Sequence, residues 1–312
     1  MYCVVLLRCT VYYLAKESIL SRLAAQFTHL TLEADSPIDL HMHTTYSDGR
    51  WPAQQLIDYL AAEDFALVAV TDHDRVDTVA EIQQLAAAKQ LPVLSGVEMS
   101  TEWRGRMGHV LCYGFDPEQN ELLPLTEKIV RLQLENTYEV NEALRHKGYT
   151  FARQEEILAD HGGKLRRPYD NIRLLRTHGH APDERSAMQM ITQAGYRSII
   201  ADMGETVDAA HRSGAVCLIA HPGRRESSFT YYDTALLDQV RAEIPIDGIE
   251  IYHPYHNKDM IETYLQYART HDLLFSTGSD AHCHRGRMPI KHRAEMSRKL
   301  LERLGITVLI NA

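Results

Sequence analysis

Residues 39–49 read DLHMHTTYSDG, and this stretch indicates more about the fold and chemistry of the 312-residue chain than any other. In an extended strand alternate side chains lie on one face, so His41 and His43 can point into the same cavity while Met42 packs behind them. Two neutral imidazoles on one face are suitable ligands for a divalent metal ion. The pattern predicts one half of a metal site, to which Asp48 can add a carboxylate.

More ligand-type side chains lie next to apolar, strand-like segments farther along the chain. They are, in chain order, Asp72 and His73 after ALVAV (66–70), Glu98 after LSGV (94–97), His109 before VLCY (110–113), His221 after VCLIA (216–220), and Asp280 with His282 after FSTGS (275–279). A catalytic metal site needs ligands at strand ends around a sheet or barrel. The spacing therefore predicts that these side chains complete the site.

Five short blocks occur in the order DLHMHTTYSDG (39–49), TDHD (71–74), GVEMS (96–100), AHPGR (220–224) and SDAH (279–282). Together they resemble the polymerase and histidinol phosphatase (PHP) family of phosphoesterases, from about residue 37 to the C-terminal region. The chain looks most similar to the standalone members related to ribonuclease AM and the nucleoside 3′,5′-bisphosphate phosphatases. The resemblance implies an α/β fold, a distorted (β/α)7 barrel with an α-helical insertion, and a trinuclear metal centre. The catalytic metal ligands that it implies are His41, His43, Asp48, His73, Glu98, His109, His221, Asp280 and His282.

Strand and helix signals alternate on both sides of a different middle segment. Residues 37–118 and 204–312 show the alternation typical of βα units and a largely parallel sheet, and we expect them to form the barrel domain. Residues 119–203 lack strand-like apolar runs and are predicted to be a helical insertion that caps the barrel. Residues 1–36 form an N-terminal extension, with a helix expected at 15–27. A packed segment, an oligomer contact and a start codon placed too far upstream are the alternatives for this extension.

Charge and composition limit the classes of partner. The net charge of −9 opposes sequence-independent binding to long duplex nucleic acid, which depends on many lysine and arginine contacts to phosphates. It permits an anionic substrate, because bound cations reverse the local field. The apolar N-terminal run is too short to span a bilayer. The five cysteines include no CxxC pair, so we expect neither a disulfide framework nor a zinc ribbon, and the simplest location is the cytoplasm.

The ligand types suit hydrolysis of a phosphate ester. A cluster of divalent ions can supply a metal-activated hydroxide, neutralise the phosphoryl oxygens and stabilise the leaving alkoxide. Glu98 is the candidate for a bridging carboxylate, since its two oxygens can hold two adjacent cations. The histidine-rich set suits manganese, iron or zinc better than calcium or magnesium. We expect two or three ions per chain, with manganese preferred.

Four residues outside the ligand set are predicted to contact the substrate. Arg224 follows a proposed ligand through a Pro-Gly turn, so its guanidinium can reach a phosphate bidentately. Arg167 and Tyr169 belong to the segment RRPY (166–169), which resembles the Arg-Pro-His segment that lines the substrate cavity in the family. Tyrosine stands here where histidine is usual. His253 follows a strand on the expected active-site side, and a role beside the substrate is favoured over a role as a metal ligand.

Three further carboxylates flank the predicted ligands. Asp72 is expected to orient an imidazole rather than to bind metal. Asp39 is expected to face away from the two histidines as another orienting partner, and Asp74 is open between a ligand, an orienting partner and a turn residue.

The sequence therefore predicts a phosphoric ester hydrolase for a small phosphorylated substrate or the end of a short single-stranded RNA. The preferred substrates are a nucleoside 3′,5′-bisphosphate, cleaved by a phosphatase, and a 5′-phosphorylated RNA, cleaved by a 5′–3′ exonuclease. A phosphatase for histidinol phosphate or another small molecule is the alternative enzyme. A non-catalytic polymerase-accessory module is the alternative of a different class. An amidohydrolase is disfavoured because no suitably placed lysine could bridge two metal ions.

Overall fold

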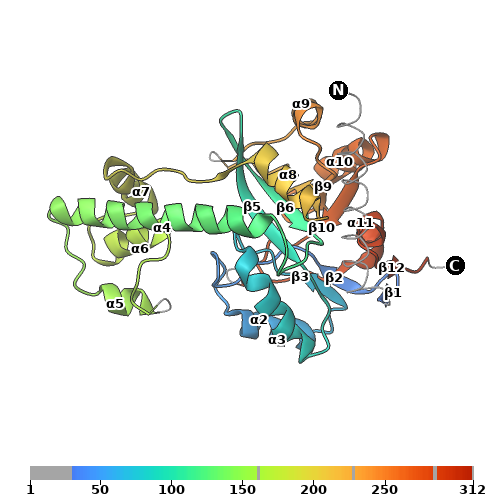
Figure 1. The fold of residues 1–312 in the computed structure, drawn as a ribbon, viewed down its shortest axis with the longest axis horizontal. Coiled ribbons are helices and arrows are strands. Elements are labelled where there is room, and N and C mark those ends of the chain that lie inside the picture. Colours follow the sequence, from blue (N-terminus) through green and yellow to red (C-terminus); the bar gives the residue numbers. More distant parts are fainter. Residues whose placement is uncertain (1–29, 160–161, 227–228, 284–286, 311–312) are drawn as a thin grey trace, which may run out of the picture. The chain divides into compact units, whose positions relative to one another are not determined.

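The computed structural model describes residues 30–159, 162–226, 229–283 and 287–310 (Figure 1). The chain divides into two compact units. One unit contains the chain up to Thr126 and again from Ala201, and the other is Glu127–Ile200. The helix expected at 15–27 lies outside the described residues.

The larger sheet of the first unit has six strands, two of which form a hairpin next to an edge strand. From edge to edge the strands are β10 (Leu274–Thr277), β9 (Gly248–Tyr252), β8 (Val216–Ile219), β6 (Arg106–Tyr113), β5 (Gly96–Trp103) and β7 (Ala201–Asp202). β6 is antiparallel to both β5 and β8, and the other neighbours are parallel. β5 turns into β6 through Arg104 and Gly105, whose φ angles of 51° and 73° are those of a two-residue type I′ turn.

A second sheet, of four strands, leads into the first ligand block. Its strands are, in order, β11 (His292–Arg293), β2 (Pro37–Asp39), β3 (Leu67–Ala69) and β4 (Val93–Leu94), and a separate parallel pair joins β1 (Thr31–Leu32) to β12 (Thr307–Val308). β2, β3 and β4 are parallel, whereas β11 is antiparallel to β2. Isolated bridges join Met42 to Ala281 and His73 to Glu98. The prediction of an α/β fold with mainly parallel strands is confirmed.

The first unit contains several helices, some of which begin at clear sequence signals. They include α2 (Ala53–Ala62), α3 (Val79–Ala87), α8 (Met203–Arg212), α9 (Thr234–Glu243), α10 (Lys258–Thr270) and α11 (Arg298–Arg303), with 3-10 turns η1 (Val76–Thr78) and η3 (Ala294–Ser297). α2 begins directly after Pro52 and buries one apolar face, as its spacing predicts. The side chains of Asp202, Asp233 and Asn257 cap α8, α9 and α10 by accepting a backbone N–H three residues later. Among the described residues, no helix is both long and apolar enough to span a membrane.

The apolar core continues the strand faces that carry the predicted ligands. On β6 alternate residues share a face, so Leu111 and Tyr113 lie on the same side as His109. Both are fully buried and belong to one cluster with Leu40 and Leu218 from other strand segments. The Tyr113 hydroxyl donates to the carbonyl oxygen of Leu40 at 2.7 Å and joins β6 to the chain just after β2. Packing of this layer positions the strand ends that carry the predicted ligands.

The second unit is helical and has its own core. Its helices are most of α4 (Leu122–His146), with α5 (Gln154–Ile157), α6 (Pro168–Thr177) and α7 (Glu184–Gln193). Leu144, Phe151 and Leu175 belong to a buried cluster of this unit. The carboxylate of Asp170 accepts the backbone N–H groups of Arg166 and Arg167 at 2.7 and 3.2 Å, so the RRPY segment forms the N-terminal cap of α6.

Candidate metal centre

His41 and His43 lie just after β2, and both side chains contact Glu98. Met42, between them, packs instead into an apolar cluster, as the alternation of an extended chain predicts. The backbone N–H of His43 donates to the carbonyl oxygen of Ala281 at 2.9 Å. The two histidines are therefore held beside the segment that carries Asp280.

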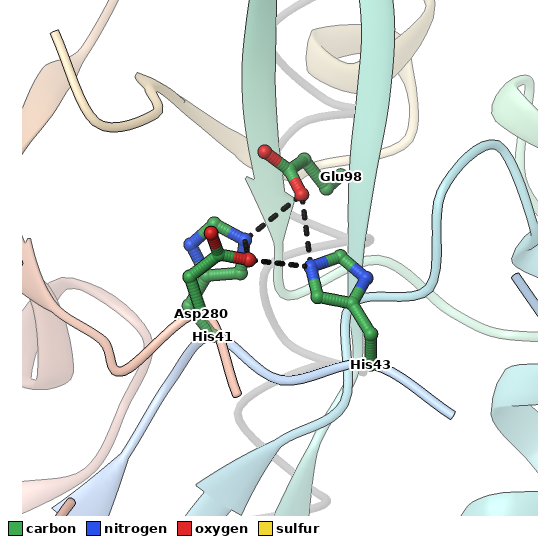
Figure 2. Close-up of side chains that lie close together, drawn as sticks. All are labelled: His41, His43, Glu98 and Asp280. Atoms are coloured by element: carbon green, nitrogen blue, oxygen red, sulfur yellow. Dashed lines mark hydrogen bonds and ion pairs between the residues drawn. The ribbon is translucent and has the colours of Figure 1, made fainter. Parts of the chain in front are cut away.

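Figure 2 shows the four buried side chains at the middle of the site, His41, His43, Glu98 and Asp280. The Oε2 atom of Glu98 lies 2.9 Å from Nε2 of His41 and 3.1 Å from Nε2 of His43. The Oδ1 atom of Asp280 lies 3.1 Å from Nε2 of His43 and 3.6 Å from Nε2 of His41. Two imidazole nitrogens and two carboxylate oxygens thus converge on one small region.

The other oxygen of Glu98 faces a different pair of histidines. Its Oε1 atom lies 2.7 Å from Nδ1 of His109 and 2.8 Å from Nε2 of His221. One carboxylate therefore stands between two separate groups of imidazoles. This is the arrangement required of a side chain that bridges two neighbouring cations.

Asp48 lies near the remaining predicted ligands, His73 and His282, on the side of the site that is more exposed to solvent. Its Oδ2 atom lies 3.1 Å from Nε2 of His282, and its Oδ1 atom lies 3.9 Å from Nε2 of His73. Oδ1 also lies 3.7 Å from Nδ1 of His43. The side chain of Asp48 is 50% exposed and that of His73 is 21% exposed, whereas that of His43 is inaccessible. All nine side chains named as ligands from the sequence thus lie together.

Two of these residues have a backbone conformation that is unfavourable for a side chain. His221 has φ of 28° and Asp280 has φ of 50°, both in the left-handed region. For a residue with a Cβ atom this costs on the order of 1–2 kcal/mol. Such strain is typical of functional sites, where the surrounding structure holds a side chain in position.

The donor set fits divalent cations. Atoms that bind one ion at about 2.1 Å lie roughly 3.0–3.5 Å from each other, and most of the nitrogen–oxygen separations at this site fall near that range. Nε2 of His43 is buried and makes no hydrogen bond of acceptable geometry, although two carboxylate oxygens lie 3.1 Å away. Atoms that face a common ion rather than one another have this arrangement.

The electrostatics of the cluster favour bound positive charge. Burial opposes ionisation of Glu98, but the imidazoles of His41, His73 and His109 hold its pKa well below the usual range. Burial also opposes protonation of His43, yet Asp280 and Glu98 raise the pKa of His43 to about 10. Glu98 therefore stays anionic inside the protein, where a buried carboxylate needs positive charge beside it from imidazolium groups or from bound cations.

The three flanking carboxylates accept hydrogen bonds from chain segments near the predicted ligands. Asp72 accepts the backbone N–H and the hydroxyl of Thr44 at 2.8 and 2.7 Å, and the hydroxyl of Ser47 at 2.6 Å. Asp74 accepts the backbone N–H of Ser100 at 2.9 Å. Asp39 accepts the backbone N–H groups of residues 41, 279 and 290 at 3.3, 3.0 and 2.9 Å. These carboxylates hold in place the chain segments on which the predicted ligands lie.

Two further residues contact the predicted ligands, and one of them, Glu250, was not predicted from the sequence. Glu250, on β9, contacts Nδ1 of His41 and the backbone N–H of His221. Its signal was a single acid inside the otherwise apolar strand GIEIY (248–252), where a charge needs a partner. Arg287 donates from Nη2 to Oδ2 of Asp280 at 2.6 Å, and only the folded chain reveals this contact.

Arg224 packs against an aromatic ring that in turn lies near two of the predicted ligands. Its guanidinium carbon lies 3.5 Å from the ring centroid of Phe229. That ring lies 5.0 Å from the ring of His109 and 6.1 Å from the ring of His221, measured between centroids. Nη2 of Arg224 donates to Glu226 at 2.7 Å. Arg224 is thus 16% exposed, stacked on one face and paired with an exposed acid.

The other predicted substrate contacts lie in both units. His253 follows β9, is 5% exposed, and its Nε2 atom lies 3.7 Å from Oδ2 of Asp280. Arg167 and Tyr169 belong to the second unit, where the Tyr169 hydroxyl donates to Glu184 at 3.3 Å and Nε of Arg167 lies 3.9 Å from Oδ1 of Asp170. Their contact with a substrate stays a prediction.

Comparisons with known proteins agree with this site. Residues 39–201 match the family model described as PHP domain. The chain is 30% identical to the 3′,5′-nucleoside bisphosphate phosphatase of Chromobacterium violaceum, over 78% of this chain and 87% of that protein. It is 26% identical to the 5′-3′ exoribonuclease of Haemophilus influenzae, over 78% and 89%. A solved amidohydrolase from Chromobacterium violaceum, with bound sulfate and no metal, is similar with a TM-score of 0.67 and 26% identity, over 82% of this chain and 91% of that chain.

Proposed function

The chain belongs to the PHP domain family, and on this basis we propose that it is a metal-dependent phosphoesterase that hydrolyses a phosphate ester of a nucleotide. The observation that carries the proposal is that the two carboxylate oxygens of Glu98 face different groups of histidines. Its Oε2 atom faces His41 and His43, and its Oε1 atom faces His109 and His221. Two adjacent cation positions are suited to a phosphoryl group, because several of its oxygens carry charge at once.

The nine ligand side chains would hold two or three divalent ions, and we favour manganese over iron and zinc for this mixture of imidazoles and carboxylates. When bound, the ions supply a nucleophile at neutral pH, compensate the phosphoryl charge and stabilise the leaving oxygen. His41, His43, Glu98 and Asp280 form the buried floor of the site. Asp48 is half-exposed, so we propose that the substrate enters from its side.

His253 is suited to donate a hydrogen bond to the substrate. The backbone N–H of Tyr255 donates to Nδ1 of His253 at 3.1 Å. In the neutral ring the proton must therefore be on Nε2. That atom is buried and makes no hydrogen bond within the described residues, although Oδ2 of Asp280 lies 3.7 Å away. We assign this N–H to a phosphoryl oxygen of the bound substrate.

Replacing His253 with alanine is expected to lower kcat/KM by about 10²-fold, the effect of removing one well-placed donor. The metal content should stay at the wild-type value, because Nε2 carries a proton and is not available as a ligand. Steady-state kinetics and elemental analysis check this, with His271→Ala on the surface as the matched control. Loss of an ion in His253→Ala would instead identify the residue as a metal ligand.

Arg224 is the candidate to hold a phosphate next to the ions. Stacking on Phe229 fixes the plane of its guanidinium, and Glu226 holds one edge. A substrate phosphate, which carries more charge than a carboxylate, can replace the exposed Glu226 as the partner. Arg167 and Tyr169 of the second unit are proposed to contact the rest of the nucleotide, with residues 119–203 acting as a cap.

The same proposal includes the closure of the two sheets into one barrel and the location of the protein in the cell. The bridges Met42–Ala281 and His73–Glu98 join the two sheets and support one distorted (β/α)7 barrel formed by residues 37–118 and 204–312. A cytoplasmic location agrees with the buried thiols of Cys112 and Cys217, whose sulfur atoms lie 3.8 Å apart without forming a disulfide.

We rank a nucleoside 3′,5′-bisphosphate first among substrates, because the relative with 30% identity is named for this activity. The 5′-phosphorylated end of a short single-stranded RNA is second, and the exoribonuclease relative supports it. Both place a second phosphate at nucleotide spacing from the ester that is cleaved. In this proposal Arg224 helps to hold the phosphate that is cleaved, and Arg167 with Tyr169 contacts the rest of the nucleotide, which carries the second phosphate.

The deciding measurement compares kcat/KM for a nucleoside 3′,5′-bisphosphate with the values for the matching 5′-monophosphate and for histidinol phosphate. We expect the bisphosphate to be preferred by at least about 10²-fold, since each charge-assisted contact contributes roughly 1.5–3 kcal/mol. The same protein should then be assayed on a short 5′-phosphorylated RNA. The nucleotide assignment fails if histidinol phosphate is the best substrate, or if loss of the second phosphate has no effect.

A further inference from the structure

Glu250 is a fully buried acid that contacts two ligand-bearing residues at once. It lies on β9, and its carboxylate is inaccessible to solvent. Its Oε1 atom lies 3.0 Å from Nδ1 of His41, and its Oε2 atom accepts the backbone N–H of His221 at 2.8 Å. Each oxygen therefore has a separate partner, and both partners belong to the metal centre.

The first contact determines which nitrogen of His41 can bind a cation. A carboxylate only accepts hydrogen bonds, so Nδ1 of His41 must carry a proton where it faces Glu250. In the neutral ring Nε2 is then unprotonated, and its lone pair points toward the cluster formed by Glu98 and Asp280. Without an acceptor at Nδ1 the ring could take the other tautomer, whose Nε2 is no longer a ligand.

The second contact holds a strained backbone. His221 has φ of 28°, an unfavourable conformation for a residue with a Cβ atom. Its backbone N–H is tied to Glu250, while its side chain reaches Oε1 of Glu98 at 2.8 Å. The hydrogen bond from the backbone thus helps to direct the imidazole of His221 toward the second group of ligands.

Close packing leaves Glu250 little freedom to move. A Cβ atom added at Gly278 would lie 2.5 Å from Oε1 of Glu250 and 2.3 Å from Cβ of His41. Only glycine fits at this position without displacing one of them. The surroundings therefore preserve the contact between Glu250 and His41.

We propose that Glu250 is a positioning residue that sets the tautomer of His41 and the backbone of His221, one on each side of the bridging Glu98. The inference rests on the proposed function, because it requires that these histidines bind the metal ions. It adds to that function a residue that binds no ion and acts through two that do. A carboxylate behind a ligating histidine typically changes metal affinity by about 10–100-fold.

The test is Glu250→Gln, which preserves volume but replaces one oxygen with an NH2 group. Glutamine can accept only one of the two N–H groups. If its oxygen faces His221, its NH2 faces Nδ1 of His41 and favours the wrong tautomer. If its oxygen faces His41, the N–H of His221 loses its acceptor. Either orientation should weaken binding of manganese by about 10–100-fold.

Titration of the metal-free protein with manganese, followed by calorimetry, measures the affinity without any substrate. Glu243→Gln, on α9 and paired with exposed Arg104, is the matched control and should bind manganese like the wild type. Wild-type affinity in a folded Glu250→Gln variant would overturn the inference. A protein that binds manganese normally but hydrolyses no phosphate ester would overturn only the proposed function.

If Glu250→Gln does not fold, nitrogen NMR of the wild-type protein loaded with diamagnetic zinc gives a second test. We expect the proton of His41 on Nδ1. A proton on Nε2 of His41 would contradict the proposal.

Discussion

Glu98→Gln is expected to reduce kcat by about 10³-fold or more while the protein stays folded. Glutamine keeps the volume of the side chain, but one of its two polar atoms becomes an NH2 group that cannot bind a cation. Oε2 of Glu98 faces the imidazoles of His41, His43 and His73, and Oε1 faces those of His109 and His221. Either orientation of the amide therefore removes a carboxylate oxygen from one of these groups. Metal ions contribute several kcal/mol to a transition state of this kind, and roughly 1.4 kcal/mol corresponds to a factor of ten in rate.

The chain offers a close control for this change. Glu102 lies on the same strand, β5, but is exposed. Glu102→Gln should therefore keep wild-type turnover and metal content. Kinetics, elemental analysis and circular dichroism should be measured for both variants. Turnover of Glu98→Gln within a few-fold of the wild type would exclude a bridging role, and His43→Ala and Asp280→Ala should show the same large loss.

Removal of the metal ions is expected to abolish activity and to lower the melting temperature. The purified protein should carry two or three transition-metal ions per chain, and a chelator should release them. An ion that binds only the folded state contributes about 2.7 kcal/mol of stability at a free concentration about 100 times its Kd. Activity should return when manganese is added back. Activity that survives complete removal, or one zinc ion at a single site, would contradict the proposed centre.

The affinity of the metal-free protein for manganese is expected to depend on pH. Imidazoles must be neutral to bind a cation, so binding releases the protons that they hold. In the metal-free protein burial opposes protonation, but Asp280 and Glu98 raise the pKa of His43 to about 10. His43 therefore carries a proton at neutral pH until an ion displaces it, and manganese affinity should increase as pH increases. Calorimetry in buffers with different ionisation enthalpies measures the released protons.

Local patterns and the family resemblance were sufficient to predict which side chains lie together at the site. The alternation of an extended chain separates His41 and His43 from Met42, and the structure buries Met42 in a different cluster. The apolar face and starting proline of α2 also follow from spacing that one segment contains. These features depend on the period of a strand or a helix, which neighbouring residues determine among themselves.

The direction and pairing of the strands could be predicted from the sequence only in part. The sequence predicts βα units throughout the barrel segments, but β5 and β6 form an antiparallel hairpin, and β6 is also antiparallel to β8. The hairpin brings Glu98 and His109 together across adjacent strands. The turn at Arg104 and Gly105 decides this register, and its residues resemble many other surface loops.

The sequence by itself determined which chemistry the chain carries, since the residue types and the order of the blocks indicate a metal site for a phosphate ester. Only the tertiary structure decided which histidines each carboxylate oxygen of Glu98 faces. It also decided that Glu250 contacts both His41 and His221. Glu250 lies 209 residues from His41 along the chain, and His221 lies 123 residues from Glu98. Contacts over such separations depend on how whole strands pack side by side, and no local period contains that information.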